Sequence, residues 1–600
     1  MSVLLAGAGL PQRWRGRERF VVLDTEFAAG HRFLAAWQAW RDDPLRCARL
    51  VFIALQPHVL GRIEPRAALS DAQPAGLADA LLCAWPTQTP DLHRLSFDDG
   101  RVVLLLAPGD PARWLRELVA EIDAFCVAGA ALANAERVCK AFGRLAAPGA
   151  TLAAGADDIT TLRAPLTSAG FEFRDGPEGG LMTARFAPAF APRRVPACAR
   201  DAVERHALIV GAGIAGCAAA WALAEQGWRS TLLERGPRIA GAASGNPAGL
   251  FHGIVNAQDG THARFNRAAA LAAHGAVQAA IERGAAGSAR GLLRLEAKLD
   301  VAAMRALLQR LALPPEYVCA LAAGEASEHA GITLAQPCWY YPGGGWVDPA
   351  GLARSFLDRA GAAAQLRTGA DAHRLEPGAA GWRVLDARGQ LLAEAQVVVL
   401  ANAGDAPRLL DAPGWPIDSI RGQISIAPAS ALVSARLPVA GSGYLLPATD
   451  GKVMFGATAQ RGDPDPAVRE ADHGLNLAQL ERLLGHATGL RPAELEGRTG
   501  WRCSAADRLP VIGAVPDPSA RGLHLDRPRL VPRQRGLYVF TALGSRGITW
   551  SALGAEVLAS WVTGAPAPIG AGLLDAIDPA RFVSREARRF RREPALGAGA

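Results

Sequence analysis

Residues 206–234 carry the pattern that most restricts what this chain can fold into. A short apolar run, 207–210, leads into Gly-x-Gly-x-x-Gly, then into a helix of small residues expected over 217–226, and into a second apolar run that ends at Glu234. The motif glycines are Gly211, Gly213 and Gly216. In a βαβ unit they permit a tight turn, close approach of a pyrophosphate and close packing of helix on strand. Glu234, roughly 20 residues further on, suits hydrogen bonding to an adenosine ribose. The pattern predicts a dinucleotide site for FAD or NAD.

Later segments favour FAD over NAD. A loop of small and polar residues, 241–249, follows the first βαβ unit, and near the C-terminus an apolar strand, 536–540, leads into a Gly/Ser loop and a helix over 550–562. Such a loop and helix N-terminus present backbone N–H groups to an electron-rich cofactor edge. The loop residues expected to contact the cofactor are Ser244, Gly245, Asn246, Gly544, Ser545, Gly547, Ile548 and Thr549. In flavoproteins the nucleotide-binding domain is typically built from the first βαβ unit together with residues near the C-terminus.

Five motifs of the C-terminal block resemble known flavoenzymes. They are GAASGNPAG (241–249), YYPGGGWVDP (340–349), RGQIS (421–425), GWRCSAADRLPVIG (500–513) and GSRGIT (544–549). Over 206–592 the chain resembles FAD-dependent amine oxidases of the D-amino-acid, glycine and sarcosine oxidase superfamily. More closely, it is similar to the oxidase half of the bifunctional tRNA-modification enzymes of the MnmC family.

That resemblance implies an activity and one site residue. The family's oxidase half removes the carboxymethyl group from 5-carboxymethylaminomethyl-(2-thio)uridine at the tRNA wobble position and leaves the 5-aminomethyl base. Arg502 matches the arginine that holds the substrate carboxylate in related amine oxidases, and a guanidinium offers a planar two-donor fork for a carboxylate. A structural arginine is the alternative interpretation of Arg502.

The residues alone do not decide the roles of two histidines, and they leave two alternative functions open. His252 and His473 are candidate acids or bases, although a lone histidine beside apolar residues is more often structural. An oxidase of free glycine-like or sarcosine-like amines, with no RNA partner, is one alternative function. A non-catalytic flavoprotein that binds tRNA is another.

The first 190 residues predict a second α/β domain. Strands are expected at 20–24, 50–55 and 101–106, and a helix at 31–40. The segments at 9–14, 20–37, 93–106 and 144–153 resemble the methyltransferase half of the same family. The resemblance implies a Rossmann-like domain that uses S-adenosylmethionine to methylate the aminomethyl base.

This block departs from its family where the chemistry lies. The turn after the first strand reads Asp24-Thr25-Glu26-Phe27-Ala28-Ala29-Gly30 and keeps a single glycine, so Cβ atoms and the Glu26 side chain would crowd a cofactor. Gln56 stands where an acid holds the ribose, and 127–131 lacks the acid, ring and proline of the loop near the methyl acceptor. We expect S-adenosylmethionine binding to be lost and the block to serve as a tRNA-docking or stabilising platform. A fully bifunctional enzyme is the alternative.

Composition and charge set the remaining expectations. A chain of 600 residues, half of them hydrophobic, can bury large cores, which excludes wholesale disorder. Its net charge of +7 permits an anionic partner without demanding one. Nine scattered cysteines without a CxxC pair favour reduced thiols over disulfides or zinc, and no apolar run reaches the roughly 18–20 residues that span a bilayer. We expect a cytoplasmic protein with neither metal nor membrane; the oligomeric state stays open.

The predicted organisation is mixed α/β. The methyltransferase-like domain covers 1–190, a linker 191–205, the oxidase domain 206–592 and a disordered tail 593–600. Within the oxidase domain, FAD-binding parts are expected at about 206–270, 340–420 and 500–592. An interleaved α+β substrate domain is expected at about 271–339 and 421–499.

Overall fold

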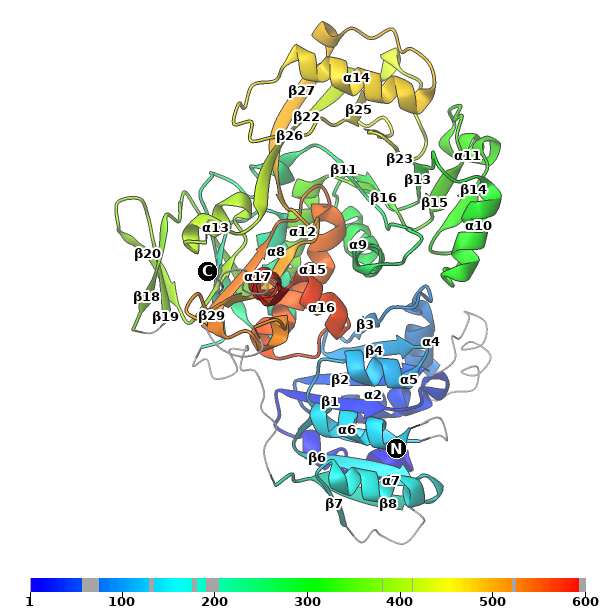
Figure 1. Ribbon diagram of the computed structural model, residues 1–600, viewed down its shortest axis with the longest axis vertical. Helices are drawn as coiled ribbons and strands as arrows, with labels where there is room; N and C mark the ends of the chain where they lie inside the picture. Colours follow the sequence, from blue (N-terminus) through cyan, green and yellow to red (C-terminus); the bar gives the residue numbers. More distant parts are fainter. Residues whose placement is uncertain are drawn as a thin grey trace, which may run out of the picture. The chain divides into compact units, whose positions relative to one another are not determined.

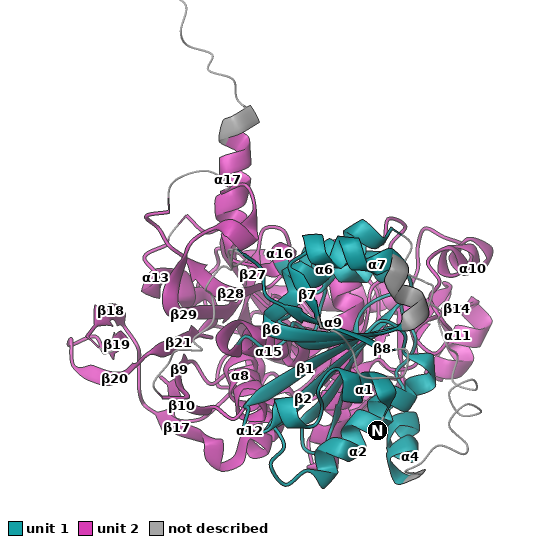
Figure 2. Cartoon of the chain, turned by 90° about the horizontal axis from the view of Figure 1, so that it is seen from below, with its two compact units in different colours: residues 1–196, 564–574 teal, residues 197–563, 575–600 magenta. Residues whose placement is uncertain are grey.

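The computed structural model describes residues 2–56, 75–128, 134–174, 181–189, 204–379, 381–412, 414–520 and 525–592. The chain forms two compact units, coloured separately in Figure 2. Unit 1 is Met1–Pro196 with Gly564–Leu574, and unit 2 is Ala197–Thr563 with Asp575–Ala600. Of the predicted linker, residues 191–203 lie outside the described residues, as does the predicted tail.

One segment of unit 1 comes from far along the chain. The oxidase domain is predicted to run unbroken to residue 592, whereas Gly564–Leu574 belongs to unit 1. Backbone polar groups fix this return, because Ala567 N–H donates to Val119 O at 3.0 Å and Gly572 N–H donates to Glu117 Oε2 at 2.8 Å. The composition of 564–574 gives no hint of these long-range bonds.

Unit 1 is built on an eight-stranded sheet in the order β3-β4-β2-β1-β5-β6-β8-β7 (Figure 1). Its strands are β1 Arg19–Asp24, β2 Arg49–Gln56, β3 His93–Phe97, β4 Val102–Pro108, β5 Ile122–Val127, β6 Ala146–Gly155, β7 Phe171–Arg174 and β8 Leu181–Phe186. The pairs from β4 to β6 are parallel, and the outer pairs are antiparallel. The predicted strands and the predicted Rossmann-like α/β fold are confirmed.

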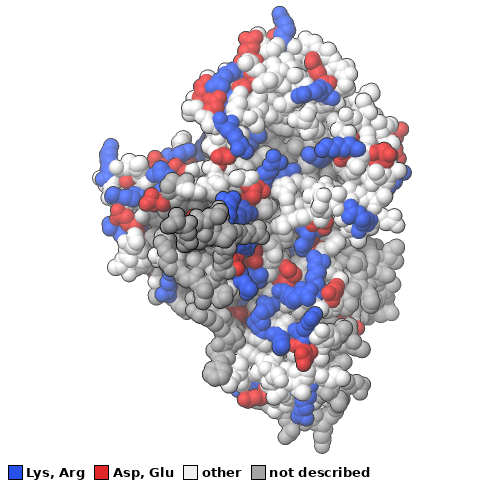
Figure 3. Space-filling model, in the orientation of Figure 1, with Lys and Arg blue, Asp and Glu red and all other residues white. Residues whose placement is uncertain are grey.

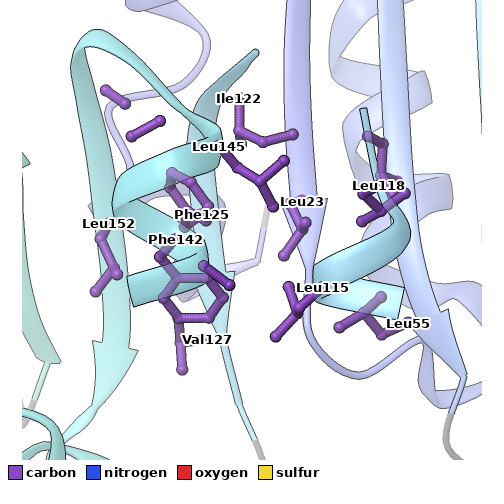
Figure 4. Packing of buried hydrophobic residues seen from close by; sticks show 14 of the residues in the cluster. Leu23, Leu55, Leu115, Leu118, Ile122, Phe125, Val127, Phe142, Leu145 and Leu152 are labelled. Carbon is purple, nitrogen blue, oxygen red and sulfur yellow. The ribbon is translucent and has the colours of Figure 1, made fainter. Parts of the chain in front are cut away.

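Helices cover both faces of this sheet, which is why its central strands are apolar on both sides. They are α1 Val3–Gly7, α2 His31–Asp42, α4 Ala75–Cys83, α5 Pro111–Glu117, α6 Ala135–Leu145 and α7 Ala156–Ser168. One core contains an aromatic cluster in which Phe33 lies 5.5 Å from both Trp37 and Phe52, measured between ring centroids. Figure 4 shows the other core, where Phe125 and Phe142 pack among leucines and valines.

Unit 2 contains a six-stranded sheet in the order β17-β10-β9-β21-β29-β28. Its strands are β9 His206–Val210, β10 Arg229–Glu234, β17 Ala364–Thr368, β21 Val397–Leu400, β28 Val511–Pro516 and β29 Arg533–Thr541. The helices beside it include α8 Ile214–Glu225, α9 Thr261–Glu282, α12 Pro349–Ala360, α13 Ala406–Leu409 and α15 Gly547–Thr563. Three apolar runs predicted as strands, 207–210, 230–233 and 536–540, all lie in this sheet. Helix α8 begins three residues before its predicted start, directly after Gly213.

A nine-stranded sheet forms the other half of unit 2, ordered β14-β15-β13-β23-β24-β25-β22-β26, with β27 paired to β22 (Figure 1). Its strands are β13 Leu292–Leu295, β14 Cys319–Leu321, β15 Cys338–Tyr341, β22 Ile417–Pro428, β23 Val439–Ala440, β24 Tyr444–Leu445, β25 Lys452–Gly456, β26 Gln460–Arg461 and β27 Glu496–Ala505. Helices α10 Val301–Arg310, α11 Ala323–Ala330 and α14 Glu470–Leu484 pack with it. Strands β22 and β27 cross the predicted boundaries near residues 420 and 500, so each is shared by the two parts of the oxidase domain.

Smaller elements complete unit 2. Two three-stranded sheets contain β11 Gly249–Phe251, β12 Gly287–Ser288 and β16 Gly345–Val347, and β18 Arg374–Gly378, β19 Gly381–Leu385 and β20 Leu391–Ala395. Helix α17 Ala580–Arg592 ends the described chain. Helix α16 Ala571–Ile577, which precedes it, begins in unit 1 and ends in unit 2.

Candidate active site in unit 2

The glycine-rich turn between β9 and α8 has the tight geometry that a pyrophosphate requires. Gly211 adopts a left-handed φ of 98°, and its N–H donates to Leu233 O at 2.8 Å. A Cβ on Gly216 would collide with the carbonyl oxygen of Gly211, so only glycine allows α8 to pack this closely. Glu234 braces the same turn, because its carboxylate accepts from Ala212 N–H at 2.9 Å.

The loop 241–246 lies beside this turn and is held by an arginine from β27. Ser244 Oγ accepts from Ile214 N–H at 3.1 Å, at the start of α8. Arg498 donates to Asn246 Oδ1 at 2.7 Å and to Ala242 O at 2.9 Å. Gly245 packs against Arg498 and Ala240, where a Cβ would have no room. Sequence reasoning missed Arg498, which lies more than 250 residues from the loop that it holds.

A cavity of about 500 Å³ runs past the turn, the loop and the start of α15. Of the predicted site residues, those lining it are Gly211, Gly213, Glu234, Ser244, Asn246, Arg502, Gly544, Ser545, Gly547, Ile548 and Thr549. Gly216 and Gly245 do not line it and instead provide close backbone packing beside it. The N-termini of α8 and α15 both open onto the cavity, and their free N–H groups suit phosphate and flavin oxygens. The cradle therefore fits FAD.

Arg502 lies at the part of this cavity that the nine-stranded sheet forms. It sits on β27 opposite Ile420 of β22, and its guanidinium lies directly over Gly422, where any Cβ would collide with it. Its Nη2 donates to Thr458 O. Burial lowers the pKa of Arg502, and among the residues that the structure describes no carboxylate forms an ion pair with it. The Arg502 guanidinium therefore faces the cavity with N–H donors left over for a ligand.

The two histidines occupy different surroundings. His252 is buried and lines the cavity; its Nδ1 lies 2.5 Å from Gly253 O, and its ring centroid is 5.3 Å from that of Tyr341. Burial lowers the pKa of His252 well below 6.5, so the ring is neutral at neutral pH. His473 does not line the cavity; its Nδ1 lies 2.7 Å from Ser425 Oγ within a buried polar cluster.

A buried ion pair holds the RGQIS motif of β22 in place. Arg421 is fully buried and donates to Asp472 Oδ2 at 2.6 Å. The same guanidinium donates to the backbone oxygens of Asp465 and Ala467. The motif therefore has a structural arginine followed by Gly422, which leaves space for Arg502.

In unit 1, the turn after β1 is occupied by the chain's own side chains. Asp24 is buried, and Arg32 Nε donates to its Oδ2 at 2.7 Å while Arg32 Nη2 donates to Glu26 O. Ala28 and Ala29 adopt left-handed φ angles of 42° and 61°, a conformation that glycine takes more readily, and their Cβ atoms lie in this turn. These residues do not fit the close approach of an S-adenosylmethionine carboxylate.

The other predicted departures in unit 1 are placed only in part. Gln56 ends β2 and is buried. In the segment 127–131, residues 129–131 lie outside the described residues. Within the described part of the chain, no group of three or more His, Cys, Asp or Glu could hold a metal ion. No helix among the described residues is long and apolar enough to cross a membrane.

Comparisons with known proteins agree with this geometry. Residues 206–561 match the family described as FAD dependent oxidoreductase. The tRNA 5-methylaminomethyl-2-thiouridine biosynthesis bifunctional protein MnmC of Methylibium petroleiphilum is 47% identical, over 97% of this chain and 92% of that protein. The protein of the same name from Burkholderia ambifaria (strain MC40-6) is 42% identical, over 98% and 93%.

A solved structure shares the fold of unit 2. The crystal structure of glycine oxidase from Geobacillus kaustophilus superposes with a TM-score of 0.51 at 21% identity, covering 62% of this chain and 97% of that one. The prediction of FAD over NAD is confirmed by the family match. The chain therefore belongs to the MnmC family, and its unit 2 is an FAD-dependent oxidoreductase.

Proposed function

We propose that unit 2 oxidatively removes the carboxymethyl group from 5-carboxymethylaminomethyl-(2-thio)uridine at the wobble position of tRNA. The relatives' names supply the tRNA context, and Arg502 is the observation that carries the substrate class. Arg502 is half-buried at the wall of a flavin cavity, and no acidic side chain of the described residues pairs with it; such an arginine suits a substrate of the form R–NH–CH2–COO⁻. With tRNA as substrate, we also infer a cytoplasmic location.

The residues of the chain position the substrate for this reaction. Bound FAD supplies a hydride acceptor for the carbon between nitrogen and carboxylate. Arg502 holds the carboxylate, which fixes that carbon within the cavity. The N–H groups at the start of α15, from Gly547 to Thr549, stabilise negative charge that develops on the cofactor edge. Water then releases the carbonyl fragment and leaves the aminomethyl base. Neutral His252, whose Nδ1 contacts the Gly253 carbonyl oxygen, forms part of the cavity wall.

We further propose that unit 1 does not methylate the product. The Asp24–Arg32 pair and the Cβ atoms of Ala28 and Ala29 support this, since they occupy the turn that would hold the cofactor. Retained methyl transfer would require Arg32 to leave Asp24 and the backbone to approach a ligand past two methyl groups.

Unit 1 instead offers a basic face that suits RNA. Figure 3 shows Lys and Arg side chains gathered over α5 and α6. Arg116, Arg137 and Lys140 are exposed there, and among the described residues no ion pair engages them. Arg144 joins the two helices by donating to Leu115 O at 2.6 Å. Exposed cations without acidic partners are the arrangement that neutralises phosphates. We call Arg116, Arg137 and Lys140 the α5–α6 basic face.

One experiment tests both halves of the proposal. Transfer RNA bearing the carboxymethylaminomethyl base is incubated with purified protein, with and without S-adenosylmethionine, and digested for nucleoside analysis. The proposal expects the aminomethyl base in both samples. Unchanged substrate contradicts the oxidase, while methylaminomethyl base in the second sample contradicts the loss of methyl transfer.

A further inference from the structure

Four arginines line the cavity of unit 2: Arg235 lies beside Glu234 at the nucleotide end, and the other three come from three separate elements. Arg294 lies on β13, Arg502 on β27, and Arg546 in the loop before α15. The acidic residues that line the same cavity are Glu234, Asp371 and Asp405. Glu234 braces the glycine-rich turn, and Asp371 directly follows Ala370, whose N–H donates to Glu234 O.

These acids all belong to the nucleotide end of the cavity. Asp405 is already paired with Arg408 at 2.9 Å. At the end formed by the nine-stranded sheet, every charged residue that the described part of the chain contributes to the lining is therefore an arginine. Arg502 is accounted for by the substrate carboxylate. The other two need a separate explanation.

Arg294 and Arg546 line the same cavity close enough for their charges to interact, and among the described residues no acidic side chain forms an ion pair with either of them. Burial, and then the charge of Arg294, lower the pKa of Arg546 to about 10, while two tyrosines act in the opposite direction. The only hydrogen bond that the described residues offer the Arg546 guanidinium is a long one, 3.5 Å from its Nη1 to His252 O. No hydrogen bond or ion pair among the described residues engages the Arg294 side chain. Two partly desolvated guanidinium groups that repel each other are stabilised by a shared anion.

We propose that Arg294 and Arg546 form a second anion subsite that takes a phosphodiester group of the nucleotide substrate. This inference rests on the proposed function and deepens it. That substrate has one carboxylate, which Arg502 takes, and its other anions are phosphates. An arginine guanidinium can donate two parallel hydrogen bonds to two phosphate oxygens, as it does to the two oxygens of a carboxylate. Free glycine or sarcosine has no phosphate, so the subsite selects a nucleotide over a free amine.

The test compares two small substrates that differ only in phosphate. They are 5-carboxymethylaminomethyluridine and its 3′,5′-bisphosphate, both assayed for kcat/KM with the FAD-loaded full chain. We expect the bisphosphate to be preferred at least tenfold by the unaltered protein. Arg294→Gln and Arg546→Gln should each reduce that preference to about twofold or less, and Arg294→Lys should keep part of it.

A matched control lies next to the subsite. Arg290 is exposed, precedes β13 and does not line the cavity. Arg290→Gln should keep the full preference. The flavin absorbance of each variant is measured as well. A value equal to that of the unaltered protein shows that a lost preference is not caused by loss of FAD.

The outcomes separate this inference from the proposed function. If neither compound is oxidised and substrate tRNA is also left unchanged, the proposed function fails. If both compounds are oxidised equally well by the unaltered protein, only the subsite fails. Equal losses on both compounds in Arg294→Gln also overturn the subsite, because the pair would then act on the carboxylate or the cofactor. A second readout needs no variant: uridine 3′,5′-bisphosphate should inhibit at least tenfold more strongly than uridine, and equal inhibition overturns the proposal.

Discussion

Arg32 donates from Nε to Asp24 Oδ2 across 2.7 Å, in the turn where a methyltransferase of this family would bind its cofactor. The pair joins the end of β1 to the start of α2 across the turn, so cofactor binding that uses Asp24 would have to break a charge-assisted hydrogen bond before making any of its own. We predict that calorimetric titration of the full chain with S-adenosylmethionine gives no binding heat at 1 mM ligand. Clear micromolar binding would contradict this account of unit 1.

The backbone of the same turn gives a stability prediction. Ala29 has a φ of 61°, where glycine is favoured, so Ala29→Gly should stabilise unit 1 by about 0.5–1 kcal/mol. The matched control is Ala35→Gly within α2, which should destabilise by about 1 kcal/mol. Denaturant unfolding measures both. A loss of stability in Ala29→Gly similar to that in the control would show that the left-handed conformation carries no strain.

Arg502→Ala should chiefly weaken carboxylate recognition. Truncating one partner of a desolvated charge pair costs about 2–4 kcal/mol, equivalent to a fall in kcat/KM of roughly 30- to 1,000-fold. Gly422→Ala should act in the same direction, because its Cβ would displace the Arg502 guanidinium. Steady-state oxidation of the carboxymethylaminomethyl substrate measures the effect. Normal kinetics in Arg502→Ala would remove this residue from the site.

The buried Arg421–Asp472 pair should contribute far more to the free energy of unfolding than an exposed ion pair does. Arg421→Met leaves Asp472 buried and unpaired, which costs about 3–5 kcal/mol of unfolding free energy. Arg461→Met removes the exposed pair with Asp418 on a neighbouring part of the same sheet and should cost about 0–1 kcal/mol. Chemical denaturation followed by flavin release compares the two variants. Similar losses would mean that the Arg421 pair does not anchor β22.

His252 gives a pH dependence of known sign. Its folded pKa is depressed below 6.5 by burial, so under acid conditions the unfolded chain takes up a proton that the folded chain does not. Stability contributed by the neutral ring is present above pH 6.5 and falls by about 1.4 kcal/mol per pH unit below it. His252→Asn should remove this part of the loss measured between pH 7.5 and 5.5. An unchanged pH dependence in the variant would place the proton elsewhere.

The α5–α6 basic face predicts a salt effect on RNA binding. Replacing Arg116, Arg137 and Lys140 together with Gln should weaken tRNA binding and reduce the slope of log K against log salt by about 2–3, because each phosphate contact contributes about 0.7–0.9. Three exposed arginines of unit 2, Arg367, Arg374 and Arg388, provide a charge-matched control triple. Equal slopes for the two triples would show that net charge alone acts.

Local patterns were enough to predict the βαβ turn. The glycines, the apolar strands and Glu234 are all within 30 residues of one another, and each shapes its own neighbourhood. The fold class and FAD as the cofactor could likewise be predicted from short motifs, and the motif around Arg502 pointed to a residue that lines the cavity.

Long-range partners could not be predicted in that way. Arg498 holds Asn246 from another strand, and Gly564–Leu574 joins unit 1 by hydrogen bonds to residues more than 400 positions away. Arg294 carries no motif, and only the nine-stranded sheet brings it to the cavity that Arg546 lines. In a chain with many arginines, the local sequence does not indicate which of them will have no acidic side chain beside them in the fold.

The central claim is oxidation of a tRNA-borne secondary amine by unit 2, and anaerobic reduction of the FAD-loaded protein tests it most directly. Substrate tRNA carrying the carboxymethylaminomethyl base is mixed with the protein without oxygen, and the flavin absorbance near 450 nm is followed as the base is analysed. The account predicts bleaching of the flavin with one aminomethyl base formed per flavin reduced. A flavin that stays oxidised in the presence of substrate tRNA, or that is bleached by free sarcosine and not by the tRNA, would contradict it.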